Sequence, residues 1–395
     1  MRILFIHNKY QFRGGEDATL QMERELLVRK GHEVDVLEFS NDNIRGAFSK
    51  VKAGFSALYN SKSAQLLADR ITGFKPDVVH VHNLFFTASP SVLYKAKAMK
   101  VPVIMTIHNY RLVCANALLL RDNHVCELCV NKTFPLDGIR YKCYRHSAVE
   151  SALVTSITSV HKILSTWKNK IDQFIVVSNF MKGKLQHSSL QLPESKTVVL
   201  PNLSGDMQPN LDGRSDHFLF AGRLSYEKGI DVLLESFASA PQTKLVIAGD
   251  GPLKDMVTQR IQSLPNISYI GLQTKEQVTA LMKDCKALIF PSRWYEGMPI
   301  TIIEAFATGT PVIAAQIGVM PEMIQDGYNG FLFEAGNSVA LTHRVRQFES
   351  MNGQAAQLYK DARQTYLDRY HPEIHYHALL TIYEKTIASV LANAR

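Results

Sequence analysis

Residues 287–315, ALIFPSRWYEGMPITIIEAFATGTPVIAA, constrain the fold of this 395-residue chain more than any other stretch. Residues 287–290 and 311–314 are short apolar runs, typical of strands buried in a parallel sheet. Between them, Pro299 suits the start of a helix and Gly309 suits the position after its end. The stretch therefore predicts a strand–loop–helix–strand unit, and such units bind ligands at the carboxyl ends of their strands.

Two glutamates of this stretch point to the kind of ligand. Glu296 lies in the loop, and Glu304 lies in the helix on the same face as Ile300 and Thr301. Free amides and the dipole of the first helical turn favour phosphate, whereas carboxylates there would accept hydrogen bonds from hydroxyls of the same ligand. We expect a sugar–diphosphate–ribose, with Glu296 at the sugar and Glu304 at the ribose. The alternative is a surface helix with two solvated glutamates.

The composition narrows the possible partners. A net charge of +8 and a pI near 9.1 allow nucleotide phosphates or an anionic membrane surface as partners. Nucleic acid is not expected, because no basic stripe with interleaved aromatic residues is present. No run approaches the roughly 20 apolar residues of a membrane span, and the N-terminus does not resemble a signal peptide. We expect a cytoplasmic protein, and the basic segment 43–74 is a candidate for peripheral contact with the inner face of a membrane.

The chain opens with a Rossmann-type pattern: a strand at 2–7, a loop ending in Gly14 and Gly15, a helix at 16–29 and a strand at 33–39. The paired glycines allow the backbone to approach a ligand closely. A further strand at 101–108 ends in His108, which could serve as an acid or as a polar ligand contact. The full G-x-G-x-x-G motif is missing, which disfavours a nicotinamide oxidoreductase.

The pattern of strands and helices repeats after a linker rich in Gly, Pro, Asn and Asp at 204–215. The predicted fold class is therefore α/β with two Rossmann-like domains and parallel sheets. We place the first domain at 1–205, with a cysteine-rich insertion at 112–146, and the second at 206–371. Residues 372–395 are predicted to form a helix that crosses back to the first domain.

Four of the five cysteines fall in the insertion: Cys114, Cys126, Cys129 and Cys143. Cys126 and Cys129 have the two-residue spacing of a chelating pair. In a reducing cytoplasm, four clustered thiols favour a structural zinc ion over disulfides. The spacing between the pairs differs from that of a standard zinc ribbon, so packed, reduced cysteines are the alternative.

The loop after the strand at 217–221 carries two cations, Arg223 and Lys228, which should lie beside the Glu296 loop. Two cations at strand ends could neutralise a diphosphate leaving group. The chain has no Asp-x-Asp motif, so catalysis is expected to need no metal or other cofactor.

Several segments together resemble a known family. They are FAGRLSYEKGIDVLLESF, IAGDGPL, PSRWYEGMPITIIEAFATGTPVIA and DGYNGFLF, supported by the GG loop and TIHN near the N-terminus. The chain resembles family 4 retaining glycosyltransferases of the GT-B architecture, which has two facing Rossmann-like domains with a cleft between them.

The resemblance implies a role for each matching residue. Arg223, Lys228, Glu296 and His108 would be catalytic, with Arg223 and Lys228 at the donor diphosphate, and Glu296 and His108 near the donor sugar. The implied donor-binding residues are Gly14, Gly15, Gly271, Leu272, Gln273, Glu296, Gly297, Met298, Pro299, Ile300, Thr301 and Glu304. Within this set, Gly271, Leu272 and Gln273 would read the base, and Glu304 would bind the ribose.

The expected activity is transfer of a sugar, with retention, from a nucleotide-diphosphate sugar to a hydroxyl of a sugar or lipid-linked acceptor. A role in the synthesis of cell-surface polysaccharide or glycolipid fits a basic cytoplasmic member of this family. The alternatives are a nucleotide-sugar epimerase of the same architecture and a non-catalytic protein that binds sugar nucleotides.

Overall fold

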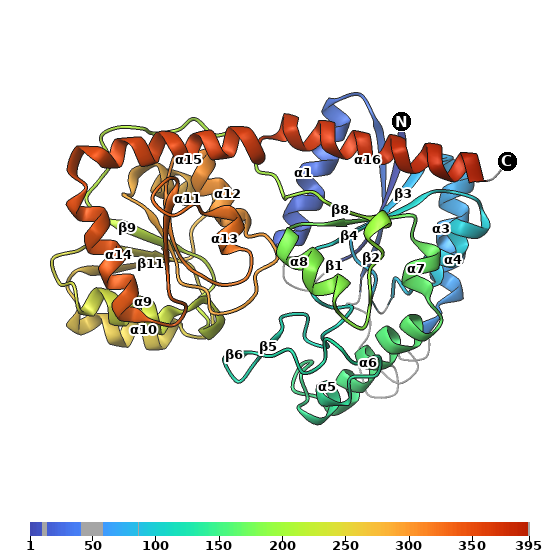
Figure 1. Ribbon diagram of the computed structural model, residues 1–395, viewed down its shortest axis with the longest axis horizontal. Helices are drawn as coiled ribbons and strands as arrows, with labels where there is room; N and C mark the ends of the chain where they lie inside the picture. Colours follow the sequence, from blue (N-terminus) through green and yellow to red (C-terminus); the bar gives the residue numbers. More distant parts are fainter. Residues whose placement is uncertain (10–13, 41–57, 86, 394–395) are drawn as a thin grey trace. The chain divides into compact units, whose positions relative to one another are not determined.

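The computed structural model describes residues 1–9, 14–40, 58–85 and 87–393 (Figure 1). Residues 43–57 of the predicted basic segment lie outside these ranges. The chain divides into two compact units. Unit 1 contains Met1–Leu119, Cys126–Asn202 and His375–Arg395, and unit 2 contains Leu120–Val125 and Leu203–Ile374.

Unit 1 is built on a six-stranded parallel sheet with the order β2-β1-β3-β4-β7-β8. Its strands are β1 (Arg2–Lys9), β2 (Glu33–Ser40), β3 (Val78–Val81), β4 (Val103–Ile107), β7 (Gln173–Val176) and β8 (Thr197–Val199). Its helices are α1 (Gly15–Arg29), α3 (Ser61–Phe74), α4 (Ser91–Ala98), α5 (Leu136–Arg140), α6 (Ala148–Ile163), α7 (Thr166–Lys170) and α8 (Asn179–Gln186), with the 3-10 turn η1 (Glu194–Lys196).

The core of unit 1 joins residues from both ends of the chain. Ile3 and Phe5 of β1 pack in one buried cluster with Leu27 of α1 and with Leu379 and Tyr383 of α16 (Pro372–Asn393). From His375 onward, α16 belongs to this unit. The apolar residues of α16 that face the sheet recur at a spacing of four, as expected for one face of a helix.

The sequence of residues 147–171 is typical of one long helical stretch, but the segment forms two helices. The first, α6, ends at Ile163, and Ser165 adopts a left-handed conformation with φ of 52° before α7 begins. Serine tolerates the left-handed conformation at modest cost in free energy. The hydrophobic periodicity of the sequence continues across this break between the two helices. The sequence pattern therefore did not reveal it.

The cysteine-rich insertion contains little regular structure. It holds a short antiparallel hairpin of β5 (Leu120–Arg121) and β6 (His124–Val125), followed by α5. Asp122 and Asn123 form the hairpin turn with φ of 49° and 63°. Two positive φ values match the twist of tightly linked antiparallel strands.

Unit 2 repeats the parallel arrangement with the order β11-β10-β9-β12-β13-β14. Its strands are β9 (Phe218–Ala221), β10 (Leu245–Ala248), β11 (Ile267–Gly271), β12 (Leu288–Phe290), β13 (Val312–Ala315) and β14 (Gly330–Phe333). Its helices are α9 (Ile230–Ala238), α10 (Lys254–Arg260), α11 (Lys275–Asp284), α12 (Ile300–Ala307), α13 (Met320–Met323), α14 (Ser338–Ser350) and α15 (Ala355–Arg369), with 3-10 turns η2 (Tyr226–Lys228), η3 (Ile261–Ser263) and η4 (Asn352–Gln354).

The two parallel sheets confirm the predicted α/β fold of two Rossmann-like domains. The strand–loop–helix–strand unit predicted at 287–315 is also present, because α12 connects β12 to its parallel neighbour β13. Gly309 follows the end of α12 with φ of 73°, as its position predicted. No helix among the described residues is long and apolar enough to cross a membrane.

Two glycines allow the loops of unit 2 to pass very close to one another. At Gly229 the φ is +71°, and a Cβ atom would lie 2.0 Å from the carbonyl oxygen of Pro291. At Gly249 a Cβ atom would lie 1.8 Å from the carbonyl oxygen of Gly222. Any other residue would force these backbones apart, so the glycines fix the loops that leave β9, β10 and β12.

Arg214, near the start of unit 2, forms hydrogen bonds with the ends of α11 and α12. The half-buried guanidinium donates to the carbonyl oxygens of Met282, Cys285 and Thr308, at 2.9, 2.9 and 3.0 Å. It also donates to the hydroxyl of Thr310 at 2.8 Å. These acceptors belong to the C-terminal ends of α11 and α12, where helical carbonyls lack partners within the helix.

We therefore predict that Arg214→Met destabilises the protein by about 2–4 kcal/mol, because several carbonyl groups lose a charged donor while the apolar stem is retained. Urea unfolding followed by circular dichroism measures the effect. Arg260→Met, at an exposed end of α10, is the matched control. Equal unfolding midpoints for the two variants would contradict the role given to Arg214.

Candidate active site

A pocket of about 330 Å³ opens at the carboxyl ends of β9 and β10 in unit 2. The strand order runs one way from β9 to β11 and the other way from β12 to β14, so the connections diverge at this point. Crevices in open parallel sheets form where the strand order reverses in this manner. The pocket therefore lies where the topology alone predicts a ligand.

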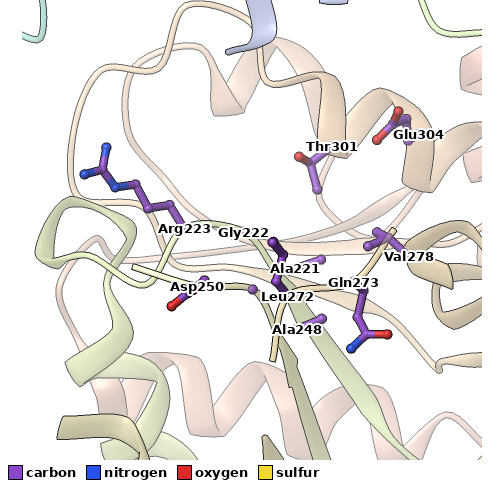
Figure 2. Close-up of a pocket in the computed structure, with 11 residues that line it drawn as sticks. Ala221, Gly222, Arg223, Ala248, Asp250, Leu272, Gln273, Val278, Thr301 and Glu304 are labelled. Carbon is purple, nitrogen blue, oxygen red and sulfur yellow. The ribbon is translucent and has the colours of Figure 1, made fainter. Parts of the chain in front are cut away.

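The pocket brings together polar side chains from three loops and a helix (Figure 2). Arg223 extends from the loop after β9 on one side, and Thr301 and Glu304 project from α12 on another. Arg223 is exposed, and no described side chain pairs with its guanidinium. Thr301 and Glu304 share the lining, as their spacing on the helix predicted.

The N-terminus of α12 has free capacity for an anion. Pro299 is its N-cap in an extended conformation, with φ of −70° and ψ of 116°, and no side chain caps the helix. Proline there supplies no hydroxyl or carboxylate for the first amides, which belong to Ile300 and Thr301. Met298, the residue before it, is buried with only 7% of its surface exposed.

Lys228 and Glu296 form an ion pair in unit 2. The Lys228 ammonium lies 2.5 Å from Oε1 of Glu296. The same oxygen accepts hydrogen bonds from the hydroxyl of Ser292 at 2.7 Å and from the indole of Trp294 at 2.8 Å. The sequence analysis expected these two loops to meet, and this cluster joins them.

The two carboxylate oxygens of Glu296 differ in their hydrogen-bond partners. No group in the described part of the chain donates to Oε2, although the residue as a whole is 6% exposed. Three donors hold Oε1 and so fix the orientation of the carboxylate. Oε2 therefore remains available to a hydroxyl of a ligand.

Glu304 is largely buried, with 16% of its side chain exposed. Burial raises the pKa of its carboxyl, and the Lys275 ammonium, 3.5 Å away, offsets part of that rise. A desolvated carboxylate whose one partner is an exposed lysine lowers the stability of the fold unless a ligand supplies further hydrogen-bond donors. Its placement in the pocket thus favours binding over a structural role.

The loop predicted to read a base leads out of β11. Leu272 lines the pocket with 76% of its surface exposed, and the amide of Gln273 donates to the carbonyl of Ile270 at 2.6 Å. Gly271 adopts a φ of 71°, which suits glycine at this turn. An exposed leucine beside a pocket offers an apolar surface for a flat ring.

The predicted residues of unit 1 are Gly14, Gly15 and His108. Gly14 is the N-cap of α1, and its amide donates to Asp17 at 2.9 Å. A Cβ atom at Gly14 would meet no described atom within 4 Å. The packing of the described atoms therefore does not require glycine at this position.

His108 follows the end of β4 and is half-buried. Burial lowers the pKa of the ring to about 4, with Glu23 nearby opposing that shift and His80 and His7 adding to it. The ring is thus neutral near pH 7. Of the two roles expected for His108, a neutral ring favours the polar contact over the acid.

No disulfide joins the four insertion cysteines, and Cys114, Cys126 and Cys143 lie near enough to Cys129 to influence its thiol. Burial and the nearby Cys114, Cys143 and Cys126 raise the pKa of the Cys129 thiol to about 12. The residue types suit zinc, but the sulfur atoms do not form a close set. Within the described residues, the group of ligand atoms that lie within 4.8 Å of one another is that of Glu23, His80 and His82.

The sequence analysis missed several contributors to these sites. Ser292 and Trp294 orient Glu296, and nothing in their sequence positions marks them. Glu23 and His375 form a buried pair at 3.1 Å in unit 1. Here a signal existed, because Glu23 interrupts the apolar stripe of α1, and a charge in a buried stripe requires a partner.

Comparison with known families identifies the family of the chain. The family model described as Glycosyltransferase Family 4 matches residues 13–203, and the one described as Glycosyl transferases group 1 matches residues 206–365. The chain belongs to glycosyltransferase family 4. The resemblance carried by the sequence segments is thereby confirmed, and the protein is a glycosyltransferase of the GT-B fold.

This glycosyltransferase is 25% identical over 338 residues to an uncharacterized 42.6 kDa protein in the cps region of Klebsiella pneumoniae, covering 78% of this chain and 83% of that protein. It is 24% identical over 278 residues to the alpha-monoglucosyldiacylglycerol synthase of Streptococcus pneumoniae, covering 68% and 58%. The crystal structure of Anabaena HepE in complex with UDP-glucose shares the fold, with a TM-score of 0.64, 16% identity and full coverage of both chains.

We predict that Glu304→Gln weakens binding of a nucleotide diphosphate by roughly 1–3 kcal/mol, because a ligand hydroxyl loses a charged acceptor. The folding stability of Glu304→Gln, in contrast, should not fall. The raised pKa of Glu304 means that ionisation costs stability as the pH rises through that pKa, so the amide should be at least as stable as wild type at pH 7.

Calorimetric titration and thermal unfolding at pH 4 and pH 7 measure the two effects. Glu276→Gln, exposed in the first turn of α11, is the control that should leave nucleotide binding unchanged. Unchanged affinity in folded Glu304→Gln would remove the ribose role.

The zinc site stays a prediction that metal analysis can test. We expect about one zinc ion per chain in protein purified without added chelator, and loss of that zinc in Cys129→Ser. Cys285→Ala, which alters the cysteine outside the insertion, should retain it. Less than about half an equivalent in the wild-type protein would count against the site.

Proposed function

We propose that this glycosyltransferase transfers a hexose from a nucleotide-diphosphate sugar to an acceptor hydroxyl with retention of configuration. The contact between Lys228 and Glu296, at 2.5 Å, carries the proposal. A cation suits the phosphate side of the bond that breaks, and a carboxylate suits the sugar hydroxyls on its other side. Glu296 lies four residues before Ile300, close in sequence to the helix end that would bind the phosphate.

In this mechanism the chain stabilises the leaving group rather than activating a nucleophile. Negative charge develops on the diphosphate as the sugar departs, and Arg223, Lys228 and the first amides of α12 oppose it. Arginine gives a bidentate contact, and lysine gives a point charge. We infer that a donor phosphate oxygen accepts the proton of the incoming hydroxyl and that no divalent metal is required.

The donor is held at three further points. Oε2 of Glu296 accepts from sugar hydroxyls, Glu304 accepts from the ribose hydroxyls, and Leu272 with Gln273 faces the base. Gly14 and Gly15 leave room near the phosphates, and His108 contacts the sugar. The Anabaena HepE complex with UDP-glucose supports a uridine nucleotide as the first donor to test.

The acceptor is proposed from chemistry and from the relatives. A protein of a cps region and a glucosyldiacylglycerol synthase are among them, which supports a polysaccharide or glycolipid product. The net charge of +8 supports peripheral contact with an anionic membrane that carries such acceptors. The relatives do not favour the epimerase or the non-catalytic alternative.

Thermal-shift screening against a panel of nucleotide sugars tests the donor. A ligand at a hundred times its dissociation constant raises stability by about 2.7 kcal/mol. The best donor is then incubated with and without glycolipid acceptors in excess chelator. A new glycoside that forms only with acceptor, with the anomeric configuration of the donor, supports the proposal. Conversion of the donor sugar without acceptor would indicate an epimerase.

We predict that Lys228→Ala loses turnover by about 10²–10³ and loses much less donor affinity, because the cation is worth more once charge develops on the leaving group. Lys228→Arg should retain part of the activity. Lys360→Ala, an exposed lysine on α15, is the control. Turnover of Lys228→Ala within about threefold of wild type would contradict its place at the diphosphate.

A further inference from the structure

A chain of buried polar side chains leads from His108 to the C-terminal helix within unit 1. Nε2 of His108 lies 3.1 Å from Nδ1 of His82. Nε2 of His82 lies 3.6 Å from Oε2 of Glu23, whose Oε1 lies 3.1 Å from Nε2 of His375. Nδ1 of His375 lies 3.0 Å from the carbonyl oxygen of Pro201. His82, Glu23 and His375 are each at most 3% exposed.

The far end of the chain fixes the direction of the hydrogen bonds. The carbonyl of Pro201 can only accept, so Nδ1 of His375 must donate to it. Burial raises the pKa of the Glu23 carboxyl, but the hydrogen bond with His375 outweighs this effect, so the pKa lies below its usual value. The 3.1 Å contact between Nε2 of His375 and Oε1 of Glu23 holds one proton, and whichever atom carries it, Oε2 of Glu23 remains an acceptor.

The middle of the chain holds two buried atoms that face each other. Neither Oε2 of Glu23 nor Nε2 of His82 has a hydrogen-bond partner in the described structure, and their separation of 3.6 Å is an electrostatic contact rather than a hydrogen bond. Because the carboxylate oxygen is an acceptor, the proton between them belongs to Nε2 of His82. Burial and the surrounding histidines hold the pKa of His82 well below its usual value, so the ring is neutral and its Nδ1 is bare.

The position of the proton on His108 then follows. A bare Nδ1 on His82 accepts, so Nε2 of His108 donates across the 3.1 Å contact. His108 is neutral, which leaves its own Nδ1 without a proton. No described group pairs with that atom, and it is not fully enclosed by protein.

We propose that Glu23, His82 and His375 are positioning residues that hold His108 as the Nε2–H tautomer, so that its Nδ1 accepts a hydrogen bond from a hydroxyl of the donor sugar. The opposite tautomer would present a donor and would favour a phosphate or carbonyl oxygen. The relay thus selects a hydroxyl ligand at His108. The inference rests on the proposed function for the identity of that ligand.

A metal ion bound by Glu23, His80 and His82 is the competing interpretation of the cluster. His80 argues against it, because both of its ring nitrogens already have partners. Nδ1 lies 2.8 Å from the Tyr383 hydroxyl, and Nε2 lies 2.7 Å from the Thr106 hydroxyl. An ion would break one of these buried hydrogen bonds.

Long-range ¹H–¹⁵N correlation spectra of histidine-labelled protein test the tautomer directly, with His108→Gln used to assign the signals. We expect a protonated Nε2 and a bare Nδ1 at His108 in the wild-type enzyme. Glu23→Met removes the acceptor for His82 and should yield a mixture of His108 tautomers. Glu23→Gln should preserve the wild-type tautomer, because its amide can donate to His375 and accept from His82.

Tyr383→Phe is the matched control, since it removes a neighbouring buried hydrogen bond outside the relay and should leave the His108 tautomer unchanged. With a donor in hand, Glu23→Met should raise the donor KM about tenfold as the competent tautomer falls to about a tenth, and Glu23→Gln should restore it. If Glu23→Met does not fold, the wild-type and Glu23→Gln spectra decide alone.

An Nδ1–H or cationic His108 in wild type, an unchanged tautomer in folded Glu23→Met, or a stoichiometric metal ion lost from Glu23→Met would overturn the proposal. These spectra do not depend on turnover. If no nucleotide sugar is transferred while the tautomer is as expected, the proposed function fails and the relay stands.

Discussion

In a parallel sheet all strands end at one edge, and the rest of this enzyme depends on that constraint. Each strand of unit 2 needs a crossover to reach the next, and the crossovers leave β9 and β12 in opposite directions. The loops of two neighbouring strands thus diverge around a hollow that no described helix fills. Arg223, Lys228 and Glu296 all lie on these loops, and α12 begins there with uncapped amides.

The site combines rigid and unsatisfied groups. Glu296 is held by three donors on one oxygen, while its other oxygen has none among the described residues. Glu304 is desolvated, and Arg223 has no carboxylate partner in the described part of the chain. A site with fixed but unsatisfied groups needs little rearrangement when its ligand binds, which is how preorganised sites gain affinity.

Much of this could be predicted from the sequence, because it follows from local rules. Apolar runs, glycine turns and the position of Pro299 located β12, α12 and β13, and helical periodicity placed Thr301 and Glu304 on one face. Contacts between distant segments could not be predicted. The pairing of Glu23 with His375 joins residues 352 positions apart, and only the packing of α16 on the sheet of unit 1 brings them together. The break at Ser165 and the loose arrangement of the four cysteines likewise depend on tertiary context.

The membership of α16 in unit 1 has a consequence for the order of folding during synthesis. Unit 2 is almost continuous from Leu203 to Ile374, so most of it is available before the last helix leaves the ribosome. Unit 1 begins first but needs Leu379 and Tyr383 to cover Ile3 and Phe5. The part of its sheet that α16 covers must therefore stay exposed while a whole second unit is translated. A stop codon before His375 would leave this face uncovered for good, and the nascent chain would then depend on chaperones that bind exposed apolar strands.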